Sequence, residues 1–197
     1  GVGKTFVTVN LATALVQAKH KVLIVDLDFQ AGQDMARMLN LKPSRSIVDL
    51  LPVLEGSNEP NLIKEYAATH SSGLHFIPII KSTHQIGYVT ADNIKPFFRK
   101  AASVYDYILV DAGKSLNETL VTVFDYSNLI LLVATPDILA VYQVKWCLDI
   151  LQSLQFPLKM VKLVLNRSES RGSVAWQEVR SALPCEIFSH VPSDGRT

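Results

Sequence analysis

Several features are scarce in this chain of 197 residues, and each scarcity excludes a class of protein. Cys147 and Cys185 lie far apart without a CxxC motif or neighbouring histidines, so neither a disulfide framework nor a zinc or iron–sulfur site is expected. The net charge of +1 excludes a strongly basic surface that coats nucleic acid. The longest apolar run, residues 129–140, contains Pro136 and Asp137 and is shorter than the ~20 residues of a membrane-spanning helix.

The remaining composition is that of an ordinary globular protein. Apolar residues make up 48 % of the chain and charged residues 19 %. The length fits one domain over residues 1–197, large enough to bury about 70 % of its unfolded surface without disulfides or metal. We expect both cysteines to be buried, reduced thiols of a cytosolic protein.

Apolar runs and helical patterns alternate along the sequence. Residues 6–18 have apolar residues at helical spacing and lead into the apolar run 22–25. Further strands are predicted at residues 75–79, 107–110, 129–133, 161–165 and 186–190. Helices are predicted at residues 31–40, 92–103, 117–125, 137–154 and 173–182, and a loop at 52–60. Short runs that are apolar throughout are typical of buried parallel strands, which predicts an α/β fold: a mainly parallel, twisted sheet with helices on both faces.

The chain opens with Gly1-Val2-Gly3-Lys4-Thr5, the second half of a phosphate-binding loop that continues as a helix. A glycine-rich turn lets backbone N–H groups close on phosphate oxygens, and the start of the helix adds partial positive charge. Lys4 would reach the β- and γ-phosphates, and the Thr5 hydroxyl would bind Mg²⁺. The first strand and the start of the loop are expected to precede Gly1. An ordinary turn into a helix is the alternative.

Carboxylates end two of the predicted strands. Asp26 and Asp28 follow the run 22–25, and Asp111 follows 107–110. Ligands of open α/β sheets lie beyond the carboxyl ends of the strands, so the three acids are expected to converge beside the phosphate loop. Asp111 fits an acid that binds the magnesium shell through water. A helix cap or a turn is the alternative for any one of them.

Residues that follow three of the predicted strands have candidate roles in the site. Asp28 would orient the attacking water, and Asp26 would lie near the magnesium shell or hold Lys4. Gly113 would offer its N–H to the γ-phosphate, or simply form a tight turn. Asn166-Arg167 follows the run 161–165, and an Asn amide matches the adenine edge, although an Asn turn is equally common.

These motifs together resemble the MinD/ParA group of P-loop ATPases with a deviant Walker A motif. They are GVGKT (1–5), VDLDFQ (25–30), ILVDAG (108–113), VLNR (164–167) and VPSD (191–194). Residues 28–34, 41–43, 46–50, 115–118 and 135–137 further resemble the CpaE/TadZ branch, which places pilus and secretion machinery.

The resemblance implies a three-layer P-loop NTPase that binds ATP and Mg²⁺ and forms an ATP-dependent homodimer. It implies that residues 1–6 contact the nucleotide, that Thr5, Asp28 and Asp111 serve the metal, and that Asn166, Arg167 and the Pro192 loop contact adenine. A second lysine that reaches the partner's phosphates, and a receiver-like domain, would precede Gly1.

Two departures from the family pattern affect the expected activity. Phe6 stands where the family has a hydroxyl that touches the α-phosphate, and the loss of one hydrogen bond costs ~1 kcal/mol of binding. Asp111-Ala112-Gly113-Lys114 lacks the proline that many relatives have two residues after the acid. Both departures predict a weak ATPase, or a scaffold that only binds nucleotide.

The leading hypothesis is a dimerisation switch that localises or assembles a pilus or secretion system. It would be cytoplasmic, at a cell pole or at the inner membrane face through partners. A ParA-like DNA-binding positioner is the alternative; DNA is not the expected partner, because a solvated helix face explains Arg167, Arg171, Arg180 and Arg196 better than a basic patch does. MinD-like membrane attachment would need an amphipathic C-terminal helix, and a metabolic enzyme would need a substrate pocket.

Core packing is the default for the helix 137–154, and an exposed Trp146 would favour a partner surface.

Overall fold

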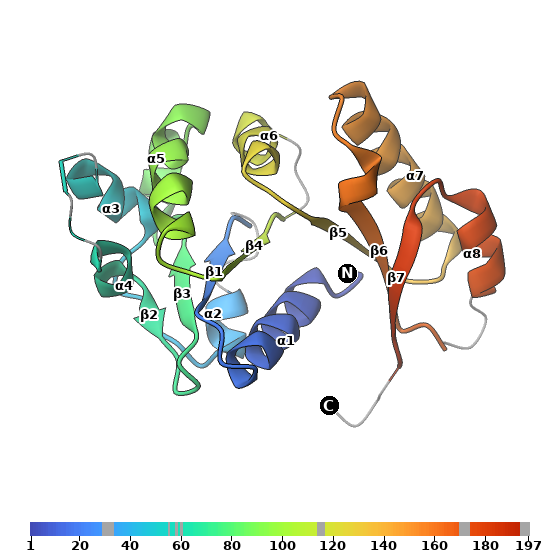
Figure 1. Cartoon of the computed structure of the whole chain (residues 1–197), viewed down its shortest axis with the longest axis horizontal. Coiled ribbons are helices and arrows are strands. Elements are labelled where there is room, and N and C mark those ends of the chain that lie inside the picture. The colour runs from blue at the N-terminus through green and yellow to red at the C-terminus, as the bar shows by residue number, and fades with distance from the viewer. Residues whose placement is uncertain are drawn as a thin grey trace. The chain divides into compact units, whose positions relative to one another are not determined.

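The computed structural model describes residues 1–28, 34–54, 56–57, 59, 61–113, 117–169 and 174–193. The chain divides into two compact units (Figure 1). One unit is Thr5–Tyr126, and the other combines Gly1–Lys4 with Ser127–Thr197. Each unit has its own sheet and its own buried residues.

The sheet of the Thr5–Tyr126 unit has the strand order β2-β3-β1-β4. Its strands are β1 (Val22–Asp26), β2 (Ala68–Thr69), β3 (His75–Pro78) and β4 (Tyr107–Asp111). β1 pairs in parallel with both β3 and β4, and β2 pairs antiparallel with β3. All five residues of β1 are buried, as expected for a central strand covered on both faces.

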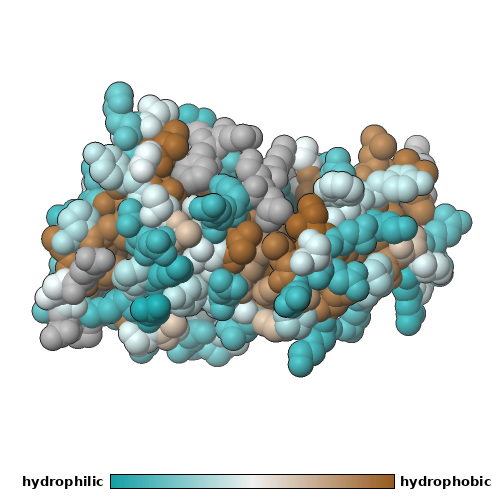
Figure 2. Space-filling model, turned by 90° about the horizontal axis from the view of Figure 1, so that it is seen from above, coloured by the Kyte–Doolittle hydropathy of each residue, from teal (hydrophilic) through white to brown (hydrophobic). Residues whose placement is uncertain are grey.

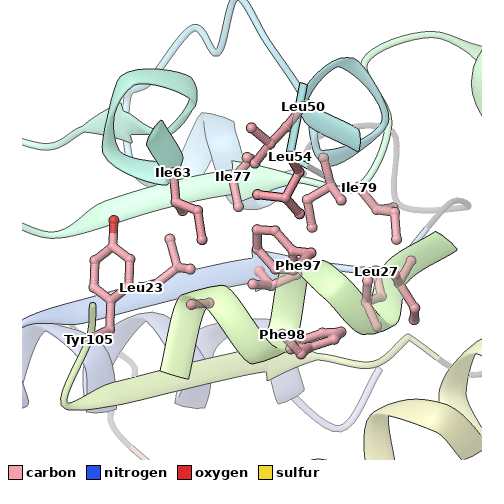
Figure 3. Close-up of a cluster of buried hydrophobic side chains, with 14 of the residues drawn as sticks. Leu23, Leu27, Leu50, Leu54, Ile63, Ile77, Ile79, Phe97, Phe98 and Tyr105 are labelled. Carbon is pink, nitrogen blue, oxygen red and sulfur yellow. The ribbon is translucent and has the colours of Figure 1, made fainter. Parts of the chain in front are cut away.

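Helices cover both faces of this sheet (Figure 1). They are α1 (Lys4–Gln17), α2 (Asp34–Met38), α3 (Ile47–Leu54), α4 (Leu62–Tyr66), α5 (Ala91–Ala102) and α6 (Glu118–Asp125), with the 3-10 helix η1 (Thr83–Tyr88). Because side chains alternate along a strand, β1 contributes to two cores. Leu23 and Val25 join residues of α3, α4, α5 and α6, and Val22 and Ile24 pack with residues of α1 and α2. Figure 3 shows Leu23 in close-up among residues of α3, α4 and α5.

The predicted loop at 52–60 is wrong at its start, because α3 continues through Pro52 to Leu54. Ser46 and Asp49 form a capping box: the Asp49 N–H donates to Ser46 Oγ over 3.3 Å, and the Ser46 N–H donates to Asp49 Oδ2 over 2.8 Å. Ile47, Leu50 and Leu54 are buried on one face. The cap and this face stabilise the helix despite the proline. α3, α4, β2 and η1 were not anticipated from the apolar periodicity.

The second unit has a parallel sheet in the order β5-β6-β7. Its elements are β5 (Ile130–Ala134), α7 (Ile138–Ser153), η2 (Leu158–Met160), β6 (Val161–Asn166), α8 (Trp176–Ala182) and β7 (Glu186–Val191). α7 contacts β5 and η2 and buries a face that includes Val144, Leu148 and Leu151, and most residues of β6 are buried as well.

The predicted α/β fold is confirmed, and the predicted strands match β1, β3, β4, β5, β6 and β7 to within one residue at each end. The predicted helix 31–40 is shorter, with α2 at Asp34–Met38, and residues 31–33 lie outside the described part of the chain. The last predicted helix begins three residues later, at Trp176, and its expected first residue is likewise outside.

Besides α3, three of the described helices begin with a side chain that caps their own backbone. Thr90 accepts from the Asn93 N–H at the start of α5, Asn117 from the Leu120 N–H at α6, and Asp137 from the Ala140 N–H at α7. Such a cap satisfies one of the N–H groups that a helix start leaves without an intrahelical partner.

Hydrophobic and hydrophilic residues are interspersed over the face shown in Figure 2. Across its described residues, the protein has no helix with the length and apolar character needed to span a bilayer.

Candidate phosphate-binding and acidic site

The carboxyl ends of β1 and β4 lie side by side and bring two acids together. Asp26 and Asp111 are partners in the parallel register of the two strands. The chain stays paired just beyond this point, where the Leu27 N–H donates to the Asp111 carbonyl over 2.9 Å. The prediction that acids from separate segments meet at one edge of the sheet is therefore confirmed for Asp26 and Asp111.

Thr5 joins the acids from the first turn of α1. Its hydroxyl donates a hydrogen bond to Asp111 Oδ2 over 2.6 Å, although 106 positions separate the two residues. Asp111 is only 3 % exposed. A hydroxyl and a carboxylate this close are hard oxygen donors of the kind Mg²⁺ prefers, and Mg²⁺ keeps several waters in addition to few protein ligands.

Asp28 reaches the same place through the loop after β1. Gly113, two residues after β4, has a φ of +65°, and a Cβ on it would lie 3.2 Å from Asp28 Cγ. A side chain at position 113 would thus be strained by the backbone and crowded by Asp28. The Gly113 N–H points back to Asp111 Oδ1 over 3.5 Å, a long contact typical of a tight turn. Its predicted role as a γ-phosphate sensor stays a prediction.

The surroundings of Asp26 shift the pKa of its carboxyl group. Its side chain is 6 % exposed, and its Oδ1 accepts the Asp28 N–H over 3.0 Å. Burial raises the pKa of Asp26 to about 6; the Asp28 N–H opposes this, and the negative charges of Asp111, Asp28 and Asp34 add to it. Burial and the neighbouring acids thus both favour the protonated form of Asp26.

The second unit gathers the glycine turn and the residues after β6. Gly3 has a φ of +90°, and Asn166 Nδ2 donates to the Val2 carbonyl over 2.9 Å. Asn166 is buried, and its Oδ1 accepts the N–H of Arg167, a residue with a φ of +55°. The Asn166 amide thus contacts the phosphate loop itself, a contact the sequence did not suggest.

The Pro192 loop lies next to these residues because β6 and β7 end together. Asn166 and Val191 are register partners, and the Ser168 N–H donates to the Val191 carbonyl over 3.0 Å. The second unit therefore brings together Val2, Gly3, Asn166, Arg167 and Pro192. Whether they contact adenine stays a prediction.

The first turn of α1 carries the remaining predicted residues. Lys4 begins the helix directly before Thr5, and no acidic residue stands in its first turn. Phe6 is 41 % exposed, so the core does not account for an aromatic side chain at this position. Within the described residues no group of three or more His, Cys, Asp or Glu side chains is arranged to hold a metal ion. The metal role expected for Thr5, Asp28 and Asp111 stays a prediction.

Several sequence-based expectations lie outside the described residues. They concern Lys114 of the switch II stretch, Arg171, Asp194 and Arg196, as well as residues 29–33 and 115–116 of the branch motifs. By contrast, Trp146 is described and is 70 % exposed on α7, the observation named above as favouring a partner surface.

The sheet topology, the glycine turn before α1 and the acids at the strand ends are those of a P-loop NTPase. The chain belongs to the AAA-domain family (AAA_31), whose model matches residues 1–161.

The curated proteins that this chain resembles include MinD- and ParA-type P-loop ATPases. A putative septum site-determining protein MinD of Guillardia theta is 26 % identical over 98 % of this chain and 72 % of that protein. The chromosome partitioning protein ParA of Myxococcus xanthus is 26 % identical over 95 % of this chain and 70 % of that protein.

Solved structures share the fold. A ParA family ATPase from Chlorobium tepidum superposes with a TM-score of 0.89 at 24 % identity, over 98 % of this chain and 80 % of that chain. The septum site-determining protein MinD of Pyrococcus horikoshii, complexed with Mg-ADP, has a TM-score of 0.78 at 20 % identity, over 98 % of this chain and 77 % of that chain.

Proposed function

We propose that this chain binds ATP with Mg²⁺, hydrolyses it slowly and uses the bound nucleotide as a dimerisation switch. The observation that carries the proposal is the hydrogen bond from the Thr5 hydroxyl to the buried Asp111 carboxylate. It joins the residue after the P-loop lysine to the strand-end acid, and these are the two residue types that hold Mg²⁺ in P-loop NTPases.

Each residue has a distinct role in this proposal. Lys4 contacts the β- and γ-phosphates, Thr5 and Asp111 hold the metal and its water shell, and Asp28 orients the attacking water. Asp28 suits this role because it packs against Gly113 on the Asp111 loop. Such alignment is most of what phosphoryl transfer requires from a protein.

Slow turnover follows from two features of the sequence. Phe6 cannot donate a hydrogen bond to the α-phosphate, and the stretch after Asp111 lacks the stiffening proline of many relatives. A switch that stays in its ATP-bound state for a long time needs low turnover. We therefore propose a weak ATPase, with ADP and phosphate as its products.

The proposed partner in the ATP state is a second copy of this chain, and the proposed cargo is pilus or secretion machinery. Support for the cargo comes from the sequence phrases that resemble the CpaE/TadZ branch. The proposed location is the cytoplasm, at a pole or at the inner membrane face through partners. The dimer predicts a doubling of the mass in solution when ATP is added to the full-length protein.

A ParA-like positioner is the second candidate, favoured by the curated ParA relative. It predicts that the ATP-bound protein retards DNA and that the affinity falls steeply with salt, because neutralised phosphates supply non-specific binding. No retardation at low salt would exclude it. ATP-dependent sedimentation with anionic vesicles would instead support a MinD-like membrane role.

Two substitutions test the nucleotide site. Lys4→Ala should abolish ATP binding, whereas Asp28→Ala should keep ATP binding and lower turnover by about 100-fold, the cost of losing alignment. Titration calorimetry and phosphate release measure the two effects. Lys159→Ala and Asp149→Ala are matched controls at exposed positions with no assigned role and should change neither. If Asp28→Ala hydrolyses ATP at the wild-type rate, the water-orienting role is wrong.

A further inference from the structure

Helix α7, labelled in Figure 1, carries apolar side chains on two opposite faces. Its buried face comprises Ala140, Val144, Leu148 and Leu151. Four further apolar residues, which we call the α7 stripe, are 61–70 % exposed: Ile138, Leu139, Tyr142 and Trp146. A buried residue follows each of Ile138, Tyr142 and Trp146 two positions later, and two positions turn an α-helix by about 200°. The stripe therefore points away from the core of its own unit.

The α7 stripe is larger than the single exposed apolar residues that any protein surface has. With roughly 200 Å² for each large side chain, the exposed fractions leave on the order of 500 Å² of the stripe accessible. A contiguous apolar patch of this size is often a functional one. Two copies that cover each other's stripe bury on the order of 1,000 Å², the lower limit for a specific protein–protein interface. The area fits a weak, reversible contact.

We propose that the α7 stripe binds the α7 stripe of a second copy of this chain, with the two helices antiparallel. The stripe is aliphatic at its amino end, aromatic at its carboxyl end and centred on Tyr142. About a twofold axis at Tyr142, each Trp146 lies level with the partner's Ile138, so the largest side chain of one copy packs on the smaller aliphatic side chains of the other. Such a self-complementary surface is what a twofold dimer requires. A parallel pair would instead place the two Trp146 side chains against each other.

The charges beside the stripe fit a second copy better than a lipid surface. Lys145 and Asp149 are the charged residues of α7, both are exposed, and their charges cancel. A helix that lies on anionic lipid is instead rich in Lys and Arg on its polar face. In the antiparallel pair, Lys145 lies level with the partner's Leu139 and Asp149 with the partner's Thr135. Like charges therefore do not meet across the contact.

The α7 contact does not require nucleotide. The stripe includes none of the residues predicted to contact ATP or Mg²⁺, so this contact goes beyond the proposed function and does not rest on it. Where the ATP-dependent dimer also forms, each chain has two different twofold contacts. Two such contacts join pairs of chains into larger assemblies. The mass reached with ATP should then exceed that of a dimer at concentrations where the α7 contact is populated.

Sedimentation equilibrium of the full-length protein in EDTA, without nucleotide, measures the contact. The wild type should show a monomer–dimer equilibrium whose dimer fraction rises with concentration. Tyr142→Lys and Trp146→Lys should each raise the dimerisation Kd by about 30-fold or more, the usual effect of losing a central aromatic residue of an interface. Tyr88→Lys is the matched control, because Tyr88 lies on η1 and is 64 % exposed, against 65 % for Tyr142. This control should dimerise like the wild type.

A wild type that stays monomeric at every concentration would overturn the inference, whether the stripe then binds another protein, a membrane or nothing. A dimer that Tyr142→Lys leaves intact, or that Tyr88→Lys weakens equally, would overturn it as well. Thermal unfolding checks that each variant is folded, and the three variants should bind Mg-ATP with the wild-type Kd. A wild type that dimerises but does not bind ATP refutes the proposed function and supports the α7 contact.

Chemical cross-linking tests the antiparallel arrangement. Because Cys147 is the more exposed of the two native thiols, the background is Cys147→Ser. Leu139→Cys and Lys145→Cys chains with tags of different mass are mixed and treated with a short bismaleimide. Position 139 of one copy lies level with position 145 of the other in the antiparallel pair, so the linked species should contain one chain of each variant. Links between copies of the same variant alone would show a parallel pair and overturn the proposed arrangement.

Discussion

The amino and carboxyl ends of strands β3, β1 and β4 carry different sets of polar side chains. At the amino end, His75 Nδ1 and the Tyr105 hydroxyl lie 2.8 Å apart, and the Lys21 N–H donates to Asp106 Oδ2 over 2.7 Å. Burial raises the pKa of Tyr105 and, together with the charge of Lys64, lowers that of His75, so both are held neutral.

The carboxyl end instead concentrates negative charge. Asp26 accepts the Asp28 N–H, and Asp111 accepts the Thr5 hydroxyl and the Gly113 N–H, all of them uncharged donors. Burial raises the pKa of Asp26 to about 6, and the other acids add to the shift. At the amino end, polar groups hydrogen-bond to one another, whereas the carboxyl end brings Asp26, Asp28 and Asp111 close together. The proposed function assigns a ligand to the carboxyl end only.

Among the tests of this comparison between the two ends, the largest expected effect is at Asp111. Asp111→Asn should lower Mg²⁺-dependent turnover by about 10- to 100-fold, as the loss of a group that orients a metal's ligands does elsewhere. It should not lower the free energy of unfolding without metal, because it removes a negative charge beside Asp26. Phosphate release over a Mg²⁺ titration measures the turnover, and urea unfolding in EDTA measures the free energy of unfolding. Unchanged turnover would mean that this end has no metal function.

The next effect concerns Asp26 and pH. Because its pKa is raised to about 6, the folded protein holds a proton that the unfolded chain has lost above about pH 4, so the free energy of unfolding falls as pH rises from about 4 to about 6. Asp26→Asn removes this cost and should be more stable than the wild type at pH 7, by on the order of 2 kcal/mol.

Urea unfolding in EDTA at pH 4 and pH 7 measures this difference. The advantage of Asp26→Asn should be present at pH 7 and nearly absent at pH 4. An equal advantage at both values would show that the carboxyl group does not titrate between them. Asp92→Asn, at a fully exposed acid on α5, is the matched control and should not show this pattern.

The smallest effect is at the amino end. Tyr105→Phe removes the partner of His75 Nδ1 and should cost about 1 kcal/mol of stability, the usual loss for one hydrogen bond. Affinity for Mg-ATP should not change, because no phosphate or metal role is assigned to this end. A change in affinity beyond twofold would show that the two ends are coupled and would break the comparison.

The sequence alone predicted what depends on local pattern. Strand β1 is a continuous apolar run, and a parallel sheet puts its carboxyl end at the same edge as that of β4, so Asp26 and Asp111 were expected near one another. The strand order that makes them register partners came from the folded chain. Helix α3 was not predicted, because Pro52 indicated a loop and apolar periodicity does not detect a capping box such as that of Ser46 and Asp49.

The remaining features depend on contacts between distant residues. Asn166 and Val2 are 164 positions apart, and no local sequence pattern near either residue predicts their hydrogen bond. The raised pKa of Asp26 likewise comes from burial and from acids on other segments. An Asn after a strand indicated a functional position, but only the folded chain shows what its amide holds.

The capped starts of α5, α6 and α7 affect where small anions can bind to the protein. Thr90, Asn117 and Asp137 already occupy an N–H group at each of those starts, and the three side chains compete there with any solute. Gly3, directly before α1, has no side chain to do the same. Sulfate and phosphate in a buffer should therefore act as competitors of the nucleotide, and chloride or acetate salts are the better medium for measuring its affinity.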